Sequence, residues 1–279
     1  MRGVQRFTDR VVVVTGASRG IGAAAAERLA AEGARVALVA RTAEHHPVLA
    51  GSLADTARRC RAHGAEALTI VADLTDPDDR ARVIPAVEDA LGPVDVLVNN
   101  AAAAIYEPTL ELSLKRRRLM TELNVHAPVD LARDVAPSMI ERGEGWIVNL
   151  SSASAEHPEG PPYDLGGVRG TYGFYGATKA MLDRLTTALA SELHHHGIRV
   201  NAVEPRAAVL TEGADARVDP SVLAGKLETI EAMVEALTWL CCCPADHTGR
   251  LEVSLELIAR EGLEVRTLDT RSPAPLAPS

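Results

Sequence analysis

Lysine and cysteine are scarce in this chain, and both scarcities narrow what it can do. Three of its 279 residues are lysines and four are cysteines, and 38 Asp and Glu residues outnumber 29 Lys and Arg residues. The net charge of −9, with basic residues scattered along the chain, argues against a protein that binds nucleic acid non-specifically through phosphates. The dense basic run is at 115–118, and we interpret it as the solvated or subunit-facing start of a helix.

The cysteines have neither the C-x-x-C spacing of a metal site nor the pattern of a disulfide framework. One is Cys60 and the other three are consecutive at 241–243. We therefore expect reduced thiols, those at 241–243 buried in a late helix. The chain also lacks an apolar stretch long enough to span a bilayer, and its charged N-terminus lacks the apolar segment of a signal peptide. These features predict a cytoplasmic protein with no membrane partner.

Short apolar runs rich in β-branched residues alternate with longer segments of helical period. The runs are RVVVVTG, ARVALVA, ALTIVADL, VDVLVNNA, GWIVNLSS and IRVNAVEP. Parallel strands need crossover connections, and helices in those crossovers cover both faces of the sheet. The pattern predicts an α/β fold, a doubly wound parallel sheet in a single domain over 1–265. The proline-rich tail at 266–279 has the composition of a disordered or arm-like end.

A glycine-rich turn follows the first apolar run, in VVVVTGASRGIGAAAAERLAAEG. Gly16, Gly20 and Gly22 would let the backbone approach a diphosphate, and the N-terminus of the next helix offers unpaired N–H donors. A tight turn with a purely structural role is the alternative. The position after the first strand of a β-α-β unit favours dinucleotide binding.

The glycine spacing T-G-x-x-x-G-x-G, together with Tyr175 and Lys179, resembles the short-chain dehydrogenase/reductase family over residues 8–255. The pairs DL at 73–74 and SS at 151–152, and NNA at 99–101, support the resemblance. It implies a Rossmann fold of about seven strands in the order 3-2-1-4-5-6-7 and a nicotinamide cofactor. The implied cofactor contacts are Gly16, Ser18, Arg19, Gly20, Ile21, Gly22, Arg41, Asp73, Leu74, Asn100, Ala101, Tyr175, Lys179, Pro205, Val209 and Thr211.

Tyr175 and Lys179 are candidate catalytic residues for a physical reason. Hydride transfer at a carbon that bears oxygen needs a proton donor or acceptor at that oxygen. A phenol with its ordinary pKa of about 10 is a poor base at neutral pH, but a nearby ammonium and a cationic nicotinamide would each favour the phenolate. Residues four apart share a helix face, so we expect Lys179 to lower the pKa of Tyr175. By the resemblance, Lys179 also holds the nicotinamide ribose.

The resemblance implies further polar residues in the catalytic set. Ser152 in IVNLSSAS would hydrogen-bond the substrate oxygen, with Ser151 as the alternative. Asn124 in ELNVHAP matches the asparagine that anchors a water relay behind the lysine. Tyr172 has no lysine four residues later, and we interpret it as a pocket or packing residue.

The chain departs from the family pattern in two loops expected at the substrate site. The loop at 153–172 is longer than usual, and its prolines and glycines favour irregular structure. Its candidate substrate contacts are Tyr163, Asp164 and Arg169. The alternative is that these three residues only order the loop. The loop at 206–228 follows Pro205 and begins with Arg206 where the family has glycine, with Val209 and Thr211 expected to face the carboxamide and diphosphate.

The insertion after the second strand and the ending TGRLEVSLELIAREGLEV, which lacks the family's Asp-Gly-Gly, resemble the hydroxysteroid dehydrogenase-like branch.

Two histidine groups invite a metal interpretation. Those at 194–196 are consecutive, so on a helix they point about 100° apart, and Gly197 is interpreted as the cap that ends the helix. Those at 45 and 46 have no second cluster to complete a tetrahedron. We predict no metal site.

Cofactor choice is expected to depend on the end of the second strand, in VALVARTAE. An acidic residue there would bind the ribose hydroxyls of NAD and repel the 2′-phosphate of NADP. This chain has Ala40 followed by Arg41, and Arg19 lies in the glycine turn, so two guanidinium groups could flank a phosphate. Ordinary surface arginines are the alternative. The pattern predicts that NADP(H) is preferred over NAD(H).

Taken together, the residues and the resemblance predict an NADP(H)-dependent oxidoreductase that interconverts an alcohol and a ketone or aldehyde. Few polar residues are aimed at the expected pocket, which favours an apolar small-molecule substrate. Two alternatives stay open, a non-catalytic cofactor-binding sensor or scaffold and a non-redox lyase or isomerase. By the resemblance, helices that start near 113 and 172 pair across a twofold axis, which predicts a homo-oligomer, a tetramer or a dimer.

Overall fold

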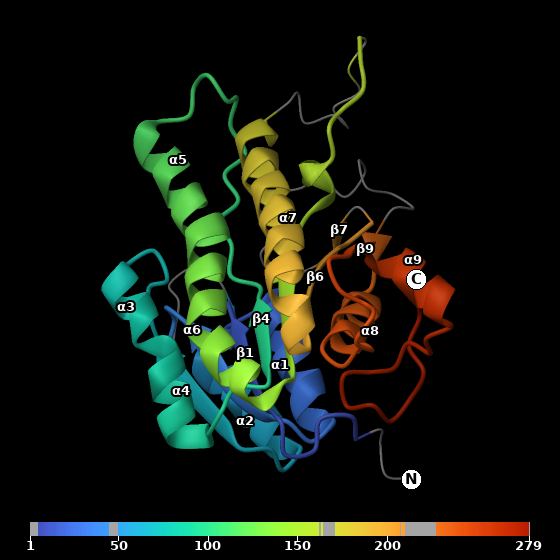
Figure 1. Cartoon of the computed structure of the whole chain (residues 1–279). Helices are drawn as coiled ribbons and strands as arrows, with labels where there is room; N and C mark the ends of the chain where they lie inside the picture. Colours follow the sequence, from blue (N-terminus) through green and yellow to red (C-terminus); the bar gives the residue numbers. More distant parts are fainter. Residues whose placement is uncertain are drawn as a thin grey trace.

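The computed structural model describes residues 5–44, 50–161, 163, 171–206, 208–209 and 227–278. Seven strands form its central sheet: β1 Val11–Thr15, β2 Arg35–Ala40, β3 Ala67–Val71, β4 Val96–Asn99, β5 Gly145–Leu150, β6 Ile198–Glu204 and β9 Leu251–Val253. All neighbouring strands are parallel. Their order, β3-β2-β1-β4-β5-β6-β9, confirms the predicted doubly wound topology (Figure 1).

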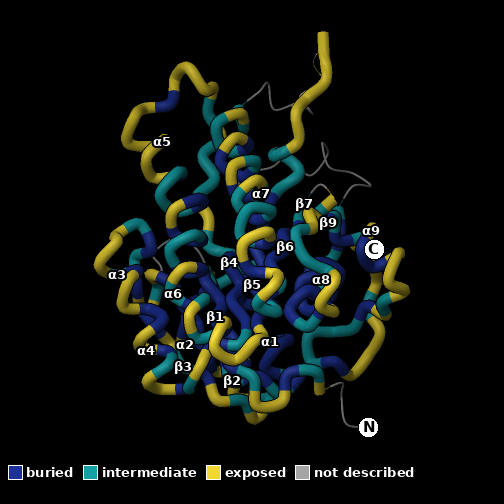
Figure 2. Tube along the Cα trace, viewed as in Figure 1, coloured by how far each residue is buried: buried dark blue, intermediate teal, exposed yellow. Residues whose placement is uncertain are grey.

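Helices pack on both faces of this sheet. They are α1 Gly20–Ala31, α2 Leu53–Ala62, α3 Pro77–Ala81, α4 Val83–Leu91, α5 Leu114–Thr121, α6 Ala127–Arg142, α7 Gly173–Leu193, α8 Ile230–Leu240 and α9 Ser254–Glu261. Alternate residues of β1 belong to different cores, because successive side chains of a strand point to opposite faces. Val12 and Val14 pack with α1, α2, α8 and α9, whereas Val11 and Val13 pack with α4, α6 and α7. Strands β1, β4 and β5 are buried throughout, and α5 is largely exposed (Figure 2).

The end of the chain departs from the family's usual ending, as the missing Asp-Gly-Gly predicts, and its tail is packed against the body. Strand β9 runs directly into α9 in place of the family's usual ending. The tail is not a free disordered end, because residues 266–278 fold back against the body. Thr229, which caps α8, donates from its Oγ1 to the carbonyl of Pro275 at 2.6 Å and from its backbone N to Leu276 at 3.2 Å. Proline lacks an N–H, but its carbonyl still accepts a hydrogen bond.

The cysteines and histidines have structural positions. All four cysteines are free thiols, but those at 241–243 follow α8 rather than lying within it, and Pro244 comes next. A short 3₁₀ helix over His194–His196 ends at Gly197 in the left-handed conformation, which confirms the predicted cap. In the described ranges, no group of three or more His, Cys, Asp or Glu residues could hold a metal ion. Among the described helices, none has both the length and the apolar character to cross a membrane.

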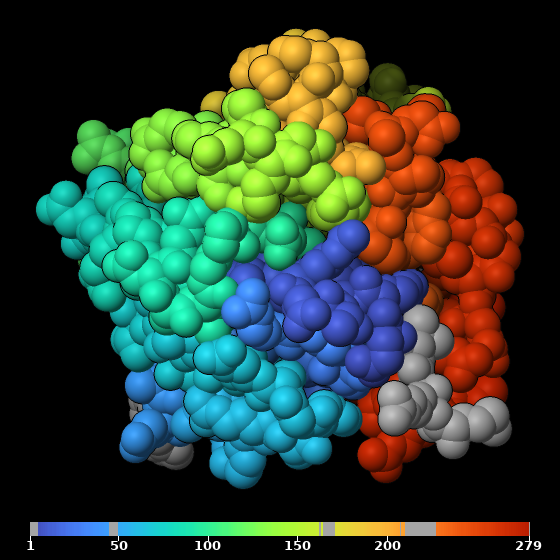
Figure 3. Space-filling view, turned by 60° about the horizontal axis from the view of Figure 1, so that its bottom comes forward, coloured from blue at the N-terminus to red at the C-terminus, as the bar shows by residue number. Residues whose placement is uncertain are grey.

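A buried ion network joins the start of the chain to α8. Arg28 of α1 pairs with Glu32 at 2.6 Å and with Glu235 of α8. Arg6 pairs with the same two carboxylates at 2.6 and 3.0 Å. The side chains of Arg28 and Glu32 are 1% and 0% exposed, so each charge depends on the others for compensation. On the face shown in Figure 3, N-terminal segments in blue border C-terminal segments in orange and red.

We expect Glu235→Gln to lower the free energy of unfolding by about 3 kcal/mol, because it leaves Arg28 buried without full compensation. Equilibrium unfolding in urea measures the change. Glu231→Gln is the control, because it removes the same charge from the first turn of α8. A loss in Glu235→Gln no larger than that of the control would show that the network contributes little.

Candidate active site

The turn after β1 brings its backbone close to its neighbours and leads directly into α1. A Cβ atom on Gly22 would lie 2.3 Å from Nδ2 of Asn100 and 2.5 Å from the carbonyl oxygen of Gly16, so only glycine fits there. Arg19 is the N-cap residue of α1 but its side chain makes no capping bond, and no acidic residue lies in the first turn. The positive end of the helix dipole is thus not neutralised by a side chain of the helix itself, and the residues present fit a diphosphate.

Asn100 clamps the ends of β1 and β4 together. Its Nδ2 donates to the carbonyls of Thr15 at 2.8 Å and of Gly16 at 3.3 Å. In return, Oγ1 of Thr15 accepts from the backbone N of Asn100 at 3.0 Å and of Ala101 at 3.1 Å. The predicted cofactor contacts in the glycine turn and after β4 therefore lie side by side at the carboxyl edge of the sheet, where open α/β sheets bind ligands.

Buried amides extend this polar line from β4 to α7. Asn99 donates from Nδ2 to Oδ1 of Asn149 on β5 at 2.9 Å, and Asn149 donates to Oγ1 of Thr186 on α7 at 2.8 Å. All three side chains are buried. These bonds fix the helix that carries the Tyr-x-x-x-Lys pair against the strand that carries the serines.

Asn124 lies in a π-helical segment, Glu122–His126, between α5 and α6. Its side chain is fully buried and makes three hydrogen bonds. Oδ1 accepts from the backbone N of Ala103 at 2.8 Å, and Nδ2 donates to the carbonyl of Ala103 and to Oγ1 of Thr178, both at 2.9 Å. Asn124 thus joins the segment after β4 to α7, and its side chain makes no direct bond to Lys179.

Ser152, Tyr175 and Lys179 come together where β5 ends beside α7. Ser152 lies near enough to the phenol of Tyr175 to lower its pKa, and its Oγ lies 2.9 Å from Oγ of Ser154. Gly176 permits this approach, because a Cβ there would lie 2.2 Å from the carbonyl oxygen of Ser154. Nζ of Lys179 is buried, donates to the carbonyl of Leu150 at 2.6 Å, and lies 5.9 Å from the centre of the Tyr175 ring.

The electrostatics of this pair correct the sequence-based prediction. Burial raises the pKa of Tyr175, and the nearby Tyr106 and Glu204 raise it further, while Ser152 lowers it. Burial also lowers the pKa of Lys179 to about 8, partly opposed by the charge of Asp183. In the protein chain itself, Lys179 therefore does not lower the pKa of Tyr175 below its usual value, because both groups are desolvated and the ammonium points to Leu150.

The residues expected to choose the cofactor lie at the ends of β2 and β3. Ala40 is the last residue of β2, and Arg41 follows with an exposed side chain whose Nη1 is 4.0 Å from Oδ2 of Asp73. Asp73 also accepts from the backbone N and Oγ1 of Thr75 at 3.0 and 2.8 Å. Arg19 is less free than expected, since it donates to the carbonyls of residues 50 and 51 at 2.9 and 3.1 Å. Of the other predicted contacts, Ser18 and Leu74 are buried and Ile21 is half-buried.

The segment after β6 is held by a carboxylate that the sequence analysis missed. Glu228, in the two-residue strand β8 Leu227–Glu228, is fully buried. It accepts hydrogen bonds from Oγ of Ser254 and from the backbone of Arg206, and burial raises its pKa to about 7. Arg206, which replaces the family's glycine, is exposed and lies 3.7 Å from Glu256. No short-range motif marks Glu228, because its partners are far away in the sequence.

Two parts of the predicted substrate site are only partly visible. Pro205 is half-buried, and Val209 is buried in β7 Ala208–Val209, which pairs with β8. In the 153–172 loop, Ala153–Ala155 forms a 3₁₀ turn and Tyr163 is 61% exposed. The predicted contacts outside the described residues are Asp164, Arg169 and Thr211.

Comparison with known proteins agrees with this arrangement. Residues 10–220 match the sequence profile of the short chain dehydrogenase family. Human L-xylulose reductase is 35% identical over 252 residues, covering 87% of this chain and 92% of that protein. Hydroxysteroid dehydrogenase-like protein 2 of Xenopus tropicalis is 31% identical over 272 residues, covering 95% of this chain and 61% of that protein. The chain thus spans under two thirds of the second relative.

Solved structures give the same result. A short chain dehydrogenase from Mycobacterium thermoresistibile superposes with a TM-score of 0.78 at 28% identity, over 98% of this chain and 94% of the other. A metagenomic short-chain oxidoreductase in complex with NADP has a TM-score of 0.70 at 30% identity, over 89% of this chain and 97% of the other. The sequence profile and the fold are therefore those of a known family. The chain belongs to the short-chain dehydrogenases, enzymes that use NAD(P) to act on CH–OH donors.

Proposed function

We propose that the protein is an NADP(H)-dependent oxidoreductase that interconverts an alcohol and a ketone or aldehyde on a mainly apolar substrate. The observation that supports it most is the meeting of Ser152, Tyr175 and Lys179 at the end of β5. Tyr106, whose ring packs edge-on against Tyr175 at 5.9 Å, supplies an aromatic wall beside the reacting oxygen. The relatives' names point to different substrates, so the proposal of a mainly apolar substrate rests on this aromatic wall.

The cofactor, when bound, supplies or accepts the hydride. The residues that would hold it are the glycine turn with Ser18, Arg19 and Ile21, then Arg41, Asp73, Leu74, Asn100, Ala101, Lys179, Pro205, Val209 and Thr211. Support for this role comes from the close packing at Gly22 and from the start of α1, where the helix's own residues provide no side-chain cap. Asn100 holds the two halves of this surface in register.

The protein's own residues manage the proton. Tyr175 is neutral near pH 7, because burial raises its pKa, so its Oη is ready to donate to a carbonyl oxygen. Ser152 lies beside the same phenol, where it can orient the substrate oxygen. Lys179, with a pKa of about 8, can carry or release a proton near neutral pH. Asn124 acts as a positioning residue by holding Thr178, one residue before Lys179.

Tyr175→Phe should lower kcat by about 10²- to 10⁴-fold, because it removes the proton donor but little binding surface. The measurement is NADPH oxidation with a panel of carbonyl compounds, paired with cofactor affinity from fluorescence titration. Affinity within about threefold of the wild type serves as the internal control. A variant that keeps more than about a tenth of wild-type kcat would show that Tyr175 is not the general acid.

Cofactor preference is proposed to follow from Ala40 and Arg41. Neither presents a carboxylate to repel a 2′-phosphate, and the exposed guanidinium of Arg41 is at the right strand end to accept one. We expect Arg41→Ala to lower kcat/KM for NADPH roughly 10- to 100-fold while NADH changes little. Ala40→Asp combined with Arg41→Ala should reverse the preference. Equal wild-type efficiency with both cofactors would contradict the proposal.

The protein is also proposed to be a homo-oligomer, a tetramer or a dimer. Exposed apolar side chains on two neighbouring helices support this, namely Leu114 and Leu119 on α5 and Met181 on α7. Closed symmetry is usual for soluble oligomers, and an apolar helix face suits such an interface. Light scattering at micromolar concentration should give at least twice the 29.6 kDa chain mass. A monomer mass would overturn this part of the proposal.

A further inference from the structure

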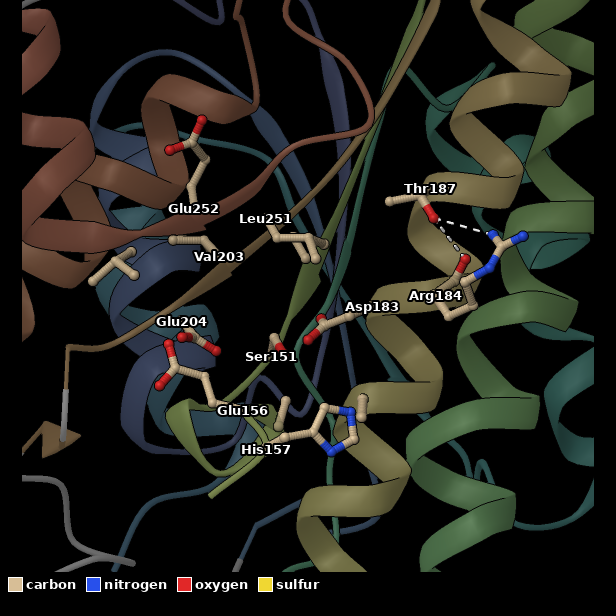
Figure 4. A pocket seen from close by; sticks show the side chains of 14 residues that line it. Ser151, Glu156, His157, Asp183, Arg184, Thr187, Val203, Glu204, Leu251 and Glu252 are labelled. Carbon is tan, nitrogen blue, oxygen red and sulfur yellow. Dashed lines mark hydrogen bonds between the residues drawn. The ribbon is translucent and has the colours of Figure 1, made fainter. Parts of the chain in front are cut away.

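A cavity of about 410 Å³ lies beside the catalytic group, between α7 and the strands β6 and β9 (Figure 4). It is separate from the glycine turn that would hold a cofactor. Its walls combine apolar and acidic side chains from four segments that are distant in the sequence. Ala180, Val203 and Leu251 supply apolar surface, while Asp183 and Glu204 supply carboxylates.

Three of the cavity's carboxylates make no ion pair with another described residue, whereas a fourth, Glu252, pairs with His247 and Arg260. Within the described ranges, no ion pair involves Asp183, Glu204 or Glu156, the last of which also lines the cavity. Asp183 is near enough to Lys179 for the charge of that lysine to lower its pKa. Arg184 also lines the cavity, but its guanidinium turns away and donates to Thr187 at 3.2 Å (Figure 4). Burial raises the pKa of Glu204 to about 7, and repulsion from the charges of Asp183 and Glu156 contributes to the rise.

Two buried polar atoms in this cavity also lack a hydrogen bond of ordinary length. Ser151 is 8% exposed, and its Oγ is buried without a hydrogen-bond partner in the described chain. Oδ1 of Asp183 is also buried without a hydrogen-bond partner in the described chain, although the hydroxyl of Ser151 is near enough to lower the pKa of that carboxyl. Most buried polar atoms in proteins are satisfied, so two unsatisfied atoms on residues that line one cavity are consistent with a missing ligand there.

We infer that this cavity binds the primary ammonium group of a small organic molecule. An ammonium carries three donors and one positive charge, which match Oγ of Ser151 and the carboxylates of Asp183 and Glu204. The apolar walls suit the methylene groups that such a molecule carries. A metal ion fits less well, because no group of three or more ligating side chains in the described ranges has the arrangement to hold one.

Occupation of the cavity is coupled to the catalytic group through Glu204. The charge of Glu204 disfavours the phenolate of Tyr175, and Asp183, Glu156 and Glu256 act on Glu204 in turn. An ammonium bound to Glu204 offsets that charge. Because such coupling is reciprocal, a change in the charge of Tyr175 also changes the affinity for the ammonium.

Isothermal titration calorimetry of the full chain with n-propylammonium chloride at pH 8 tests the site directly and needs no turnover. Saturable binding at one site per chain is expected, with propan-1-ol and potassium chloride giving none. Asp183→Asn and Glu204→Gln should each weaken binding roughly 10- to 100-fold, because each removes a charged acceptor. Glu141→Gln, an equal charge change at an exposed position of α6, should leave it unchanged.

Absence of saturable binding to the wild type would overturn the inference, as would equal binding of propan-1-ol or no effect of either carboxylate variant. If one variant fails to fold, the other still tests the site. Turnover of a neutral ketone and of its ω-amino analogue then distinguishes an ammonium group on the substrate from one on a separate effector. If the ammonium belongs to the substrate, n-propylammonium should compete with the amino ketone. If it belongs to a separate effector, n-propylammonium should change the rate on the neutral ketone. A failed redox assay with positive calorimetry would reject the proposed function and leave the ammonium site standing.

Discussion

The hydrogen bonds between Asn100 and the turn after β1 are the contact on which the rest of the site depends. They join two loops that leave neighbouring strands at the same edge, and they leave no room for a side chain at Gly22. Since α1 begins in that turn, the direction of its N-terminus is set by the same bonds. A surface that binds a diphosphate needs such a fixed backbone, because its donors are peptide N–H groups that cannot adjust as side chains do.

Helix α7 carries most of the chemistry because its period brings spaced residues to one side. Tyr175, Lys179 and Asp183 are each four residues apart and so share a helix face. Thr178 and Thr186 fasten the helix to Asn124 and Asn149. A single helix therefore connects the proposed proton donor, its lysine and the acidic cavity, and these groups influence one another through charge.

The sequence predicted what local pattern determines. Alternating apolar runs were enough to predict a doubly wound parallel sheet, the family resemblance supplied the strand order, and helix period was enough to place Tyr175 with Lys179. It did not predict the raised pKa of Tyr175, because that depends on burial by segments far along the chain. Glu228 escaped notice for the same reason, since Ser254 and Arg206 meet it only in the folded protein. Asp183 had a detectable signal, four residues beyond Lys179, but its cavity is formed by strands that the pattern cannot bring to it.

The buried ion network also has a consequence for synthesis on the ribosome. Arg6 and its partner Glu235 are 229 residues apart, so at ordinary translation rates Arg6 emerges roughly 10 to 50 s before that carboxylate. Arg28 waits nearly as long, with a separation of 207 residues. Until then α1 carries an incompletely neutralised charge that cannot be buried against α8. The nascent chain must therefore postpone closing this face of the sheet, which leaves apolar surface open to chaperones during that interval.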